Sequence, residues 1–276
     1  EIHWRDWSSD VCSSDLIDGA IATITTLPNG DLVAGGNNAG YPAPGQEARS
    51  VARWNGTTWS SLTPHGWNAW VRALTPLANG DLLAGGDFTT SPGGLASRIA
   101  RRSGTTWSPL GAGLDGAVAC CAVLPNGDIV AGGTFTAAGG VAADRCARWN
   151  GSAWLPMGTA TADPSWPRAA LALANGDVVV SHGFHAPGAV PDDGLSRWNG
   201  STWSPLGTIS DEATDDNAVW ALAQKTNGEI VVGGDFRFVN GAISRNLAAV
   251  RSTCAPTATN YGTGCSSAAG FLSITA

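Results

Sequence analysis

Short apolar runs alternate with tight polar turns along most of this chain. Asn-Gly, an acidic residue and three apolar residues follow one another five times, about fifty residues apart. The five copies begin at Asn29, Asn79, Asn126, Asn175 and Asn227. Four of the runs end in a pair of glycines, and the fourth has Ser181-His182 there. Asn-Gly between two apolar runs predicts a β-hairpin whose turn residues take positive φ angles.

A second pattern follows the first in each of the first four units. It reads A-R-W-N-G-T-T-W at residues 52–59, A-R-W-N-G-S-A-W at 147–154 and S-R-W-N-G-S-T-W at 196–203, and the second unit keeps Trp107 in register. Each unit therefore predicts four short strands with a long loop between the second and third, which in the third unit are residues 117–124, 128–132, 145–150 and 152–157. A sheet of this size cannot bury both of its faces alone. The sheets must therefore stack, with the tryptophans of strands three and four between them.

The glycine pair after strand two and the aromatic residues on strands three and four resemble the kelch-like β-propeller family. The resemblance covers residues 17–255 and implies an all-β propeller of four-stranded blades. Five blades are visible, and kelch-like rings usually close with six or seven, so the resemblance implies a fragment of a larger ring. Residues 256–276 lack the repeat and are expected to be a tail or the start of a further module. The wording N-G-D-L-V-A-G-G is also similar to repeats of secreted bacterial proteins, which implies an extracellular or cell-surface location.

Residues 6–16, DWSSDVCSSDL, are unlike the rest of the chain. They resemble the translation of a common sequencing-library adapter, so residues 1–16 are expected not to be native. An ordinary linker rich in serine and aspartate is the alternative.

Composition narrows the choice of partners. The net charge is −7 and Lys225 is the only lysine, so neither a basic surface for nucleic acid nor a lysine cluster for anionic lipid is expected. No apolar run approaches the roughly 20 residues of a membrane-spanning helix. We therefore expect a protein or glycan ligand, with no nucleic acid and no membrane insertion.

The loops divide into two rims. The Asn-Gly turns form a uniform rim, whereas the loops between strands two and three and between blades vary, so a ligand site is expected on the variable rim. Four tryptophans lie outside the repeat register and several acidic residues lie near them. The candidate ligand-binding residues are Trp67, Trp70, Trp166, Trp220, Asp87, Asp215, Asp216 and Asp235. Flat aromatic rings beside polar groups can stack on sugar rings and bond their hydroxyls, although packing within the rim would explain the same tryptophans.

Other recurring residues favour structural roles. The acid of each Asn-Gly turn and the arginine on strand three, such as Asp177 and Arg197, are expected to pair across neighbouring strands. The glycosylation motifs at Asn55, Asn150 and Asn199 coincide with turns that need Asn-Gly in any case.

Signals for metal, cofactor and disulfide chemistry are weak. The acidic stretch from Asp211 to Asp216 lacks the spacing of a calcium loop, and His182 with His185 lacks a third ligand. No cofactor is expected. Cys254 and Cys265 flank a glycine-rich loop and are expected to form a disulfide. Cys120 or Cys121 is separated from Cys146 by a whole strand, so buried thiols compete there with a bridge.

Three functions remain open from the sequence. The preferred one is a non-catalytic binding module of an exported bacterial protein, with no catalytic residue assigned and a carbohydrate as one candidate ligand. The alternatives are a carbohydrate-active enzyme with carboxylates at the channel mouth and a structural spacer.

Overall fold

The computed structural model describes residues 20–37, 50–62, 67–158, 166–182, 194–207, 209–210, 218–239 and 242–251. These segments form strands and turns without a helix, so none of them contains a helix able to cross a membrane. The chain divides into two compact units, residues 1–110 and 111–276. The predicted boundaries near residues 16 and 255 lie outside the described segments and stay predictions.

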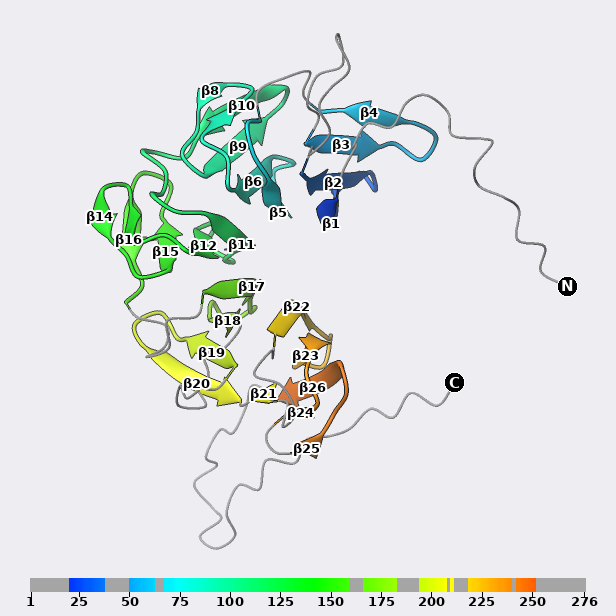
Figure 1. Ribbon diagram of the computed structural model, residues 1–276, viewed down its shortest axis with the longest axis vertical. Helices are drawn as coiled ribbons and strands as arrows, with labels where there is room; N and C mark the ends of the chain where they lie inside the picture. The colour runs from blue at the N-terminus through cyan, green and yellow to red at the C-terminus, as the bar shows by residue number, and fades with distance from the viewer. Residues whose placement is uncertain are drawn as a thin grey trace, which may run out of the picture. The chain divides into compact units, whose positions relative to one another are not determined.

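The first unit contains two four-stranded antiparallel sheets, blades 1 and 2 (Figure 1). Blade 1 consists of β1 (Ile21–Thr26), β2 (Leu32–Gly36), β3 (Val51–Trp54) and β4 (Trp59–Ser61). Blade 2 consists of β5 (Val71–Pro76), β6 (Leu82–Gly86), β9 (Ile99–Ser103) and β10 (Thr106–Pro109), with β7 (Thr90–Ser91) and β8 (Gly94–Leu95) as a small hairpin between its second and third strands. The first strands of the two blades, β1 and β5, contact each other.

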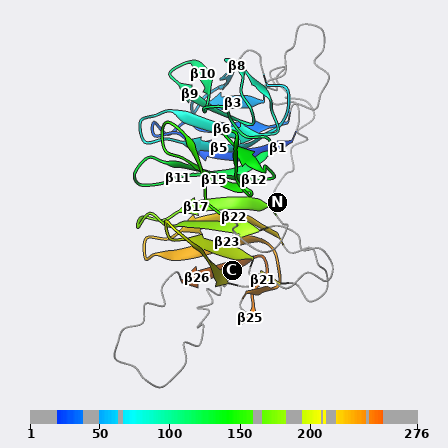
Figure 2. The same cartoon turned by 90° about the vertical axis from the view of Figure 1, so that its left-hand side faces the viewer.

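The second unit contains blades 3 to 5. Blade 3 has β11 (Val118–Val123), β12 (Ile129–Gly133), β15 (Cys146–Trp149) and β16 (Trp154–Pro156), with the hairpin β13 (Ala137–Ala138) and β14 (Val141–Ala142). Blade 4 has β17 (Pro167–Ala172), β18 (Val178–His182), β19 (Leu195–Trp198) and β20 (Trp203–Gly207). Blade 5 has β22 (Ala218–Gln224), β23 (Glu229–Asp235) and β26 (Leu247–Arg251), beside a small sheet of β21 (Ile209–Ser210), β24 (Phe238–Val239) and β25 (Ala242–Ile243). The first strands β11, β17 and β22 lie next to one another (Figure 2).

Five repeated sheets whose first strands are neighbours within each unit form a five-bladed β-propeller arrangement, which confirms the predicted fold class. The four strands predicted for the third repeat agree with those of blade 3 to within about two residues at each end.

Within each unit, apolar side chains fill the spaces between neighbouring blades. In the first unit, Val33 of blade 1 and Phe88 of blade 2 belong to one buried cluster. In the second unit, one cluster joins blade 3 to blade 4 through Val130 and Val178, and another joins blade 4 to blade 5 through Val179 and Ile230. The core therefore lies between sheets, as the repeat predicts.

Tryptophans that are paired on the adjacent strands three and four pack against each other. The ring centroids of Trp149 and Trp154 lie 5.5 Å apart, and those of Trp198 and Trp203 lie 5.4 Å apart. The indole nitrogen of Trp203 donates to the carbonyl of Met157 at 2.7 Å, so this ring also joins blade 4 to blade 3.

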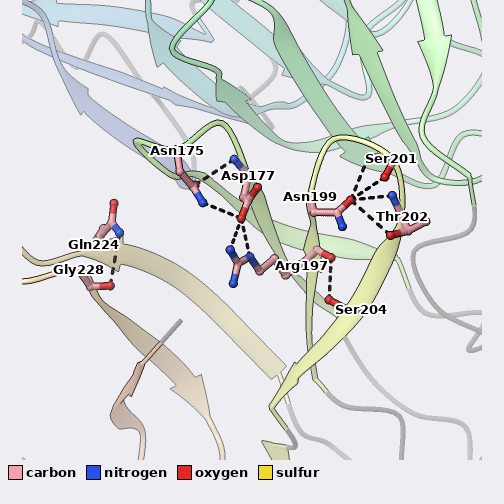
Figure 3. Close-up of polar contacts among 9 residues, drawn as sticks. All are labelled: Asn175, Asp177, Arg197, Asn199, Ser201, Thr202, Ser204, Gln224 and Gly228. Atoms are coloured by element: carbon pink, nitrogen blue, oxygen red, sulfur yellow. Dashed lines mark hydrogen bonds and ion pairs between the residues drawn. The ribbon is translucent and has the colours of Figure 1, made fainter. Parts of the chain in front are cut away.

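The uniform rim is held by side chains within the turns (Figure 3). The amide of Asn175 donates to Asp177 at 2.8 Å, and Arg197 Nε donates to the same carboxylate at 2.6 Å. In the second turn of the blade, the amide oxygen of Asn199 accepts from the backbone of Ser201 and Thr202. The matching ion pairs in other blades are Asp31–Arg53, Asp81–Arg101 and Asp128–Arg148. This rim is structural, as the repetition indicates.

The second glycine of each pair stands against a backbone carbonyl. A Cβ on Gly86 would lie 2.0 Å from the carbonyl oxygen of Trp70, and a Cβ on Gly133 would lie 2.0 Å from that of Ala117. The same carbonyl of Trp70 accepts the N–H of Asp87 at 2.9 Å. Any larger residue would push this carbonyl away and break that bond, which explains the glycine.

Blade 4 departs from the glycine pair. The hydroxyl of Ser181 accepts the N–H of Ala169 at 2.9 Å and donates to the carbonyl of Val219 in blade 5 at 3.1 Å. His182 is buried, and its Nε2 lies 3.1 Å from the hydroxyl of Ser196. Ser181 thus connects two blades by a hydrogen bond that glycine could not make.

The two glycines of blade 5 allow a matched test of this constraint. Gly234→Ala places its methyl group 2.0 Å from the carbonyl oxygen of Ala218, whereas a methyl group on Gly233 meets nothing closer than 3.9 Å. We expect Gly234→Ala to lower the free energy of unfolding by at least about 2 kcal/mol. Gly233→Ala should be neutral or slightly stabilising. Urea unfolding of both variants measures the difference, and equal effects would contradict the carbonyl argument.

Blade 2 lacks the tryptophan pair because Arg102 faces Trp107. Arg102 is half-buried, and its Nε has no hydrogen-bond partner in the described structure. Burial lowers the pKa of Arg102, and the positive charge of Arg53 lowers it further. Arg102 therefore occupies an apolar position, and the loss of hydration around its charge lowers the stability of the folded protein.

Arg102→Trp should restore the aromatic pair and remove this partly desolvated charge. We expect the free energy of unfolding to rise by about 1 kcal/mol. The reciprocal change in blade 3, Trp149→Arg, should be destabilising. Chemical denaturation checks both, and a lower midpoint for Arg102→Trp would show that Arg102 has a favourable role.

Candidate functional site

Each blade has a β-bulge near the start of its first strand. The bulge redirects one side chain from the regular alternation of side chains between the two faces of the sheet. The register shifts across a single residue in all five blades, and bulges typically redirect the side chain at that point. The residues at the bulge are Ala22, Arg72, Ala119, Arg168 and Trp220. Three of the five are large and polar or aromatic, so these bulges bear the candidate site.

In blade 2 the bulge residue forms an ion pair. Arg72 donates from Nε and Nη2 to the two carboxylate oxygens of Asp87, at 2.8 and 2.6 Å. Its guanidinium carbon also lies 5.2 Å from the ring centre of Trp70. Hydrogen bonding to Asp87 raises the pKa of Arg72, although partial burial opposes the shift. We call Trp70, Arg72 and Asp87 the blade 2 cluster.

In the second unit, the bulge residues of blades 4 and 5 come together. The guanidinium carbon of Arg168 lies 4.4 Å from the ring centre of Trp220 and 5.6 Å from that of Trp166. The indole nitrogen of Trp220 donates to Asp235 at 2.9 Å. Trp166 is 42% exposed and Trp220 is 49% exposed, so much of both rings faces solvent. We call Trp166, Arg168, Trp220 and Asp235 the blade 4–5 cluster.

The predicted site residues fall into three groups. Trp70, Trp166, Trp220, Asp87 and Asp235 lie in the two clusters. Trp67 instead lies in the core: it is 4% exposed and packs edge-on against Phe88 and Trp107, at centroid distances of 4.5 and 4.8 Å. Asp215 and Asp216 lie outside the described residues.

Sequence reasoning missed Arg72 and Arg168. Both stand two residues after a tryptophan, in W-V-R and W-P-R, at the same register position of their units. The recurrence of a tryptophan followed two residues later by an arginine, in two units only, was the sequence signal that could have identified these arginines. The bulge that aims them at the tryptophans cannot be read from an apolar pattern.

Asn68 in blade 2 and Asp115 in blade 3 each lie just before the first strand of the blade. Each accepts hydrogen bonds from the hairpin between the second and third strands. Asn68 accepts the N–H groups of Thr89 and Thr90 in blade 2. In blade 3, Asp115 accepts those of Thr136 and Ala137, both at 2.8 Å. Burial alone would raise the pKa of Asp115, but these hydrogen bonds outweigh it and lower the pKa below its usual range. Asn68 and Asp115 therefore support the loops.

The chain is similar in fold to β-propellers of known structure. Virginiamycin B lyase from Staphylococcus aureus aligns with a TM-score of 0.53 and 11% identity, over 84% of this chain and 67% of that one. The WD40 repeats of RRP9 align with a TM-score of 0.52 and 12% identity, over 79% of this chain and 58% of that one. A streptogramin B lyase structure aligns with a TM-score of 0.51 and 13% identity, over 84% of this chain and 65% of that one.

These likenesses show the propeller fold alone. No protein-family model and no curated protein sequence matches the chain. The kelch-like assignment and the adapter interpretation therefore stay predictions.

Metal chemistry gains no support from the described segments, in which no three His, Cys, Asp or Glu side chains gather to hold an ion. His185 and the acidic stretch from Asp211 to Asp216 lie outside those segments, as do Cys254 and Cys265.

The described cysteines carry thiols rather than a disulfide. Cys120 of β11 and Cys146 of β15 are both paired with Gly132 of β12, so one strand separates the two cysteines. Burial raises the pKa of Cys120 to about 12 and that of Cys146 well above its usual value. Because the thiolate is the reactive form, both groups should be inert in the folded protein.

Alkylation with iodoacetamide at pH 8, followed by peptide mass mapping, tests this. We expect Cys120 and Cys146 to remain unmodified in the native protein and to react fully in urea, because unfolding returns their pKa to about 8.5. Rapid native labelling would contradict the burial of the thiols.

Proposed function

We propose that this chain is a non-catalytic binding propeller that holds a carbohydrate on its variable-loop rim. The observation that carries the proposal is the blade 4–5 cluster, where two tryptophans, each more than two-fifths exposed, lie within 5.6 Å of one guanidinium carbon. Exposed indole rings held beside polar groups suit a sugar, since rings stack on its apolar face and polar groups bond its hydroxyls.

The arrangement of this cluster supports a preformed site. Arg168 lies against both rings, and Asp235 fixes the orientation of Trp220 through the indole N–H. A ligand that meets rings already held in place loses less conformational entropy on binding. An exposed tryptophan with no such contacts would be weaker support.

Binding is favoured over catalysis because the two described carboxylates of the clusters already have roles. Asp87 is bonded by Arg72 through both oxygens, and Asp235 accepts the indole N–H of Trp220. A glycosidase needs two carboxyl groups about 5 to 9.5 Å apart across the scissile bond. In the described part of the second unit, Asp235 is the one carboxylate bonded to a tryptophan of the cluster.

We also propose that the protein is exported from a bacterium. The resemblance of its repeats to secreted bacterial proteins supports this location, and the buried thiols, with their raised pKa values, would withstand an oxidising compartment.

A glycan-array screen followed by calorimetry tests the proposal. We expect a glycan to bind the wild-type chain and Trp166→Ala with Trp220→Ala to weaken it at least about tenfold, which is about 1.4 kcal/mol. Trp59→Ala is the matched control, because Trp59 is also 42% exposed but lies on β4 of blade 1. Its binding should match the wild type.

Two results would reject the proposal. Glycan binding that survives the double substitution would place the site elsewhere. Absence of glycan binding by a chain that circular dichroism shows to be folded would favour a protein ligand or a spacer role.

A further inference from the structure

Arg102 lies on the face of blade 2 that packs against blade 1. It is paired in register with Leu82 on one side and Trp107 on the other, and both of these residues belong to the buried cluster shared with blade 1. Residues paired directly opposite each other on neighbouring strands share a face of the sheet. In blade 4 the same position holds Trp198, which packs against the cluster that joins blade 4 to blade 3. Blade 2 therefore has a charged group where the repeat has an apolar ring.

A second arginine lies on the opposing face of blade 1. Arg53 is paired in register with Val33, which belongs to the same buried cluster, so Arg53 shares the face of blade 1 that packs against blade 2. The positive charge of Arg53 adds to burial in lowering the pKa of Arg102, as expected of two guanidinium groups that repel each other. The boundary between blades 1 and 2 thus brings two cations together.

Within the described residues, a carboxylate neutralises one of these two cations. Arg53 donates from Nε to Asp31 and forms an ion pair with the same carboxylate oxygen through Nη2. Arg102 forms no ion pair with the described residues, and its buried Nε has no hydrogen-bond partner among them. An unpaired polar group in a buried position lowers stability unless a ligand or solvent bonds it. A residue that breaks the repeat at such a cost is typical of a functional site.

We propose that Arg102 and Arg53 together bind a tetrahedral oxyanion of the phosphate or sulfate class at the boundary between blades 1 and 2. Each guanidinium presents several N–H donors in a planar fork, and two such groups can bond different oxygens of one anion. Partial burial strengthens these bonds, because less water screens the charges. The inference goes beyond the proposed carbohydrate function and does not depend on it, since the site lies in the first unit and uses no residue of the blade 4–5 cluster.

Nuclear magnetic resonance of the arginine side chains tests the site directly. Inorganic phosphate and, separately, inorganic sulfate are titrated into the full chain at neutral pH, with chloride adjusted so that the ionic strength stays constant. We expect both anions to shift the Nε–H resonance of Arg102 in a saturable manner. Constant ionic strength removes general screening, which would act on exposed charges throughout the protein.

Variants then assign the binding to these residues by calorimetry. Arg102→Gln should weaken phosphate binding at least about tenfold. Arg102→Lys should weaken it less, because lysine keeps the charge but lacks the fork. Arg148→Gln is the matched control, since it removes one positive charge from strand three of blade 3, where Arg148 is paired with Asp128. It should leave phosphate binding unchanged, whereas an effect of net charge alone would appear equally in Arg102→Gln and Arg148→Gln.

A titration with galactose 6-phosphate distinguishes the source of the anion. Binding at least as tight as that of inorganic phosphate would identify a phosphate ester as the ligand. Weaker binding would identify the free ion, because the half-buried position would then exclude the esterified group.

Two outcomes would overturn the proposal. One is an Arg102 resonance that neither phosphate nor sulfate shifts at constant ionic strength, in a chain that circular dichroism shows to be folded. The other is phosphate binding that persists in Arg102→Gln with unchanged affinity. Either result would leave the carbohydrate proposal standing, because that proposal is tested through Trp166 and Trp220.

Discussion

The close approach of a bulged backbone to a glycine governs this propeller. In the four blades that have the glycine pair, a carbonyl at or just before the start of the first strand lies where a side chain of the second glycine would be. In these four blades the contact holds the start of the inner strand close to the second strand, next to the bulge. Blade 4 keeps a bulge at the same place with His182 where the other blades have the second glycine. The stacking of blades, the tryptophan pairs and the loop hairpins all build on strands placed in this way.

Much of the fold was predictable because its signals are local. Asn-Gly turns, glycine pairs and tryptophans at fixed separations specify a hairpin without knowledge of distant residues. The ion pairs of the uniform rim followed from the same register, as Asp177 and Arg197 show. Repetition made each signal stronger, since the same turn had to work in every blade.

The candidate site was less predictable because it depends on packing between elements. Trp67 and Trp70 are three residues apart in the sequence, yet Trp67 is buried against Phe88 and Trp107 whereas Trp70 lies beside Arg72. The importance of Arg168 depends on a bulge in blade 4 and a tryptophan from blade 5. Strand alternation carries no information about either, so the tryptophans were found and the arginines were not.

The hydroxyl of Ser181 limits how far blades 4 and 5 can move relative to each other. It accepts from Ala169 of blade 4 and donates to Val219 of blade 5, immediately beside Arg168 and Trp220 in the chain. This hydrogen bond therefore ties blade 4 to blade 5 directly beside the blade 4–5 cluster, and it restricts the movement of Arg168 relative to Trp220.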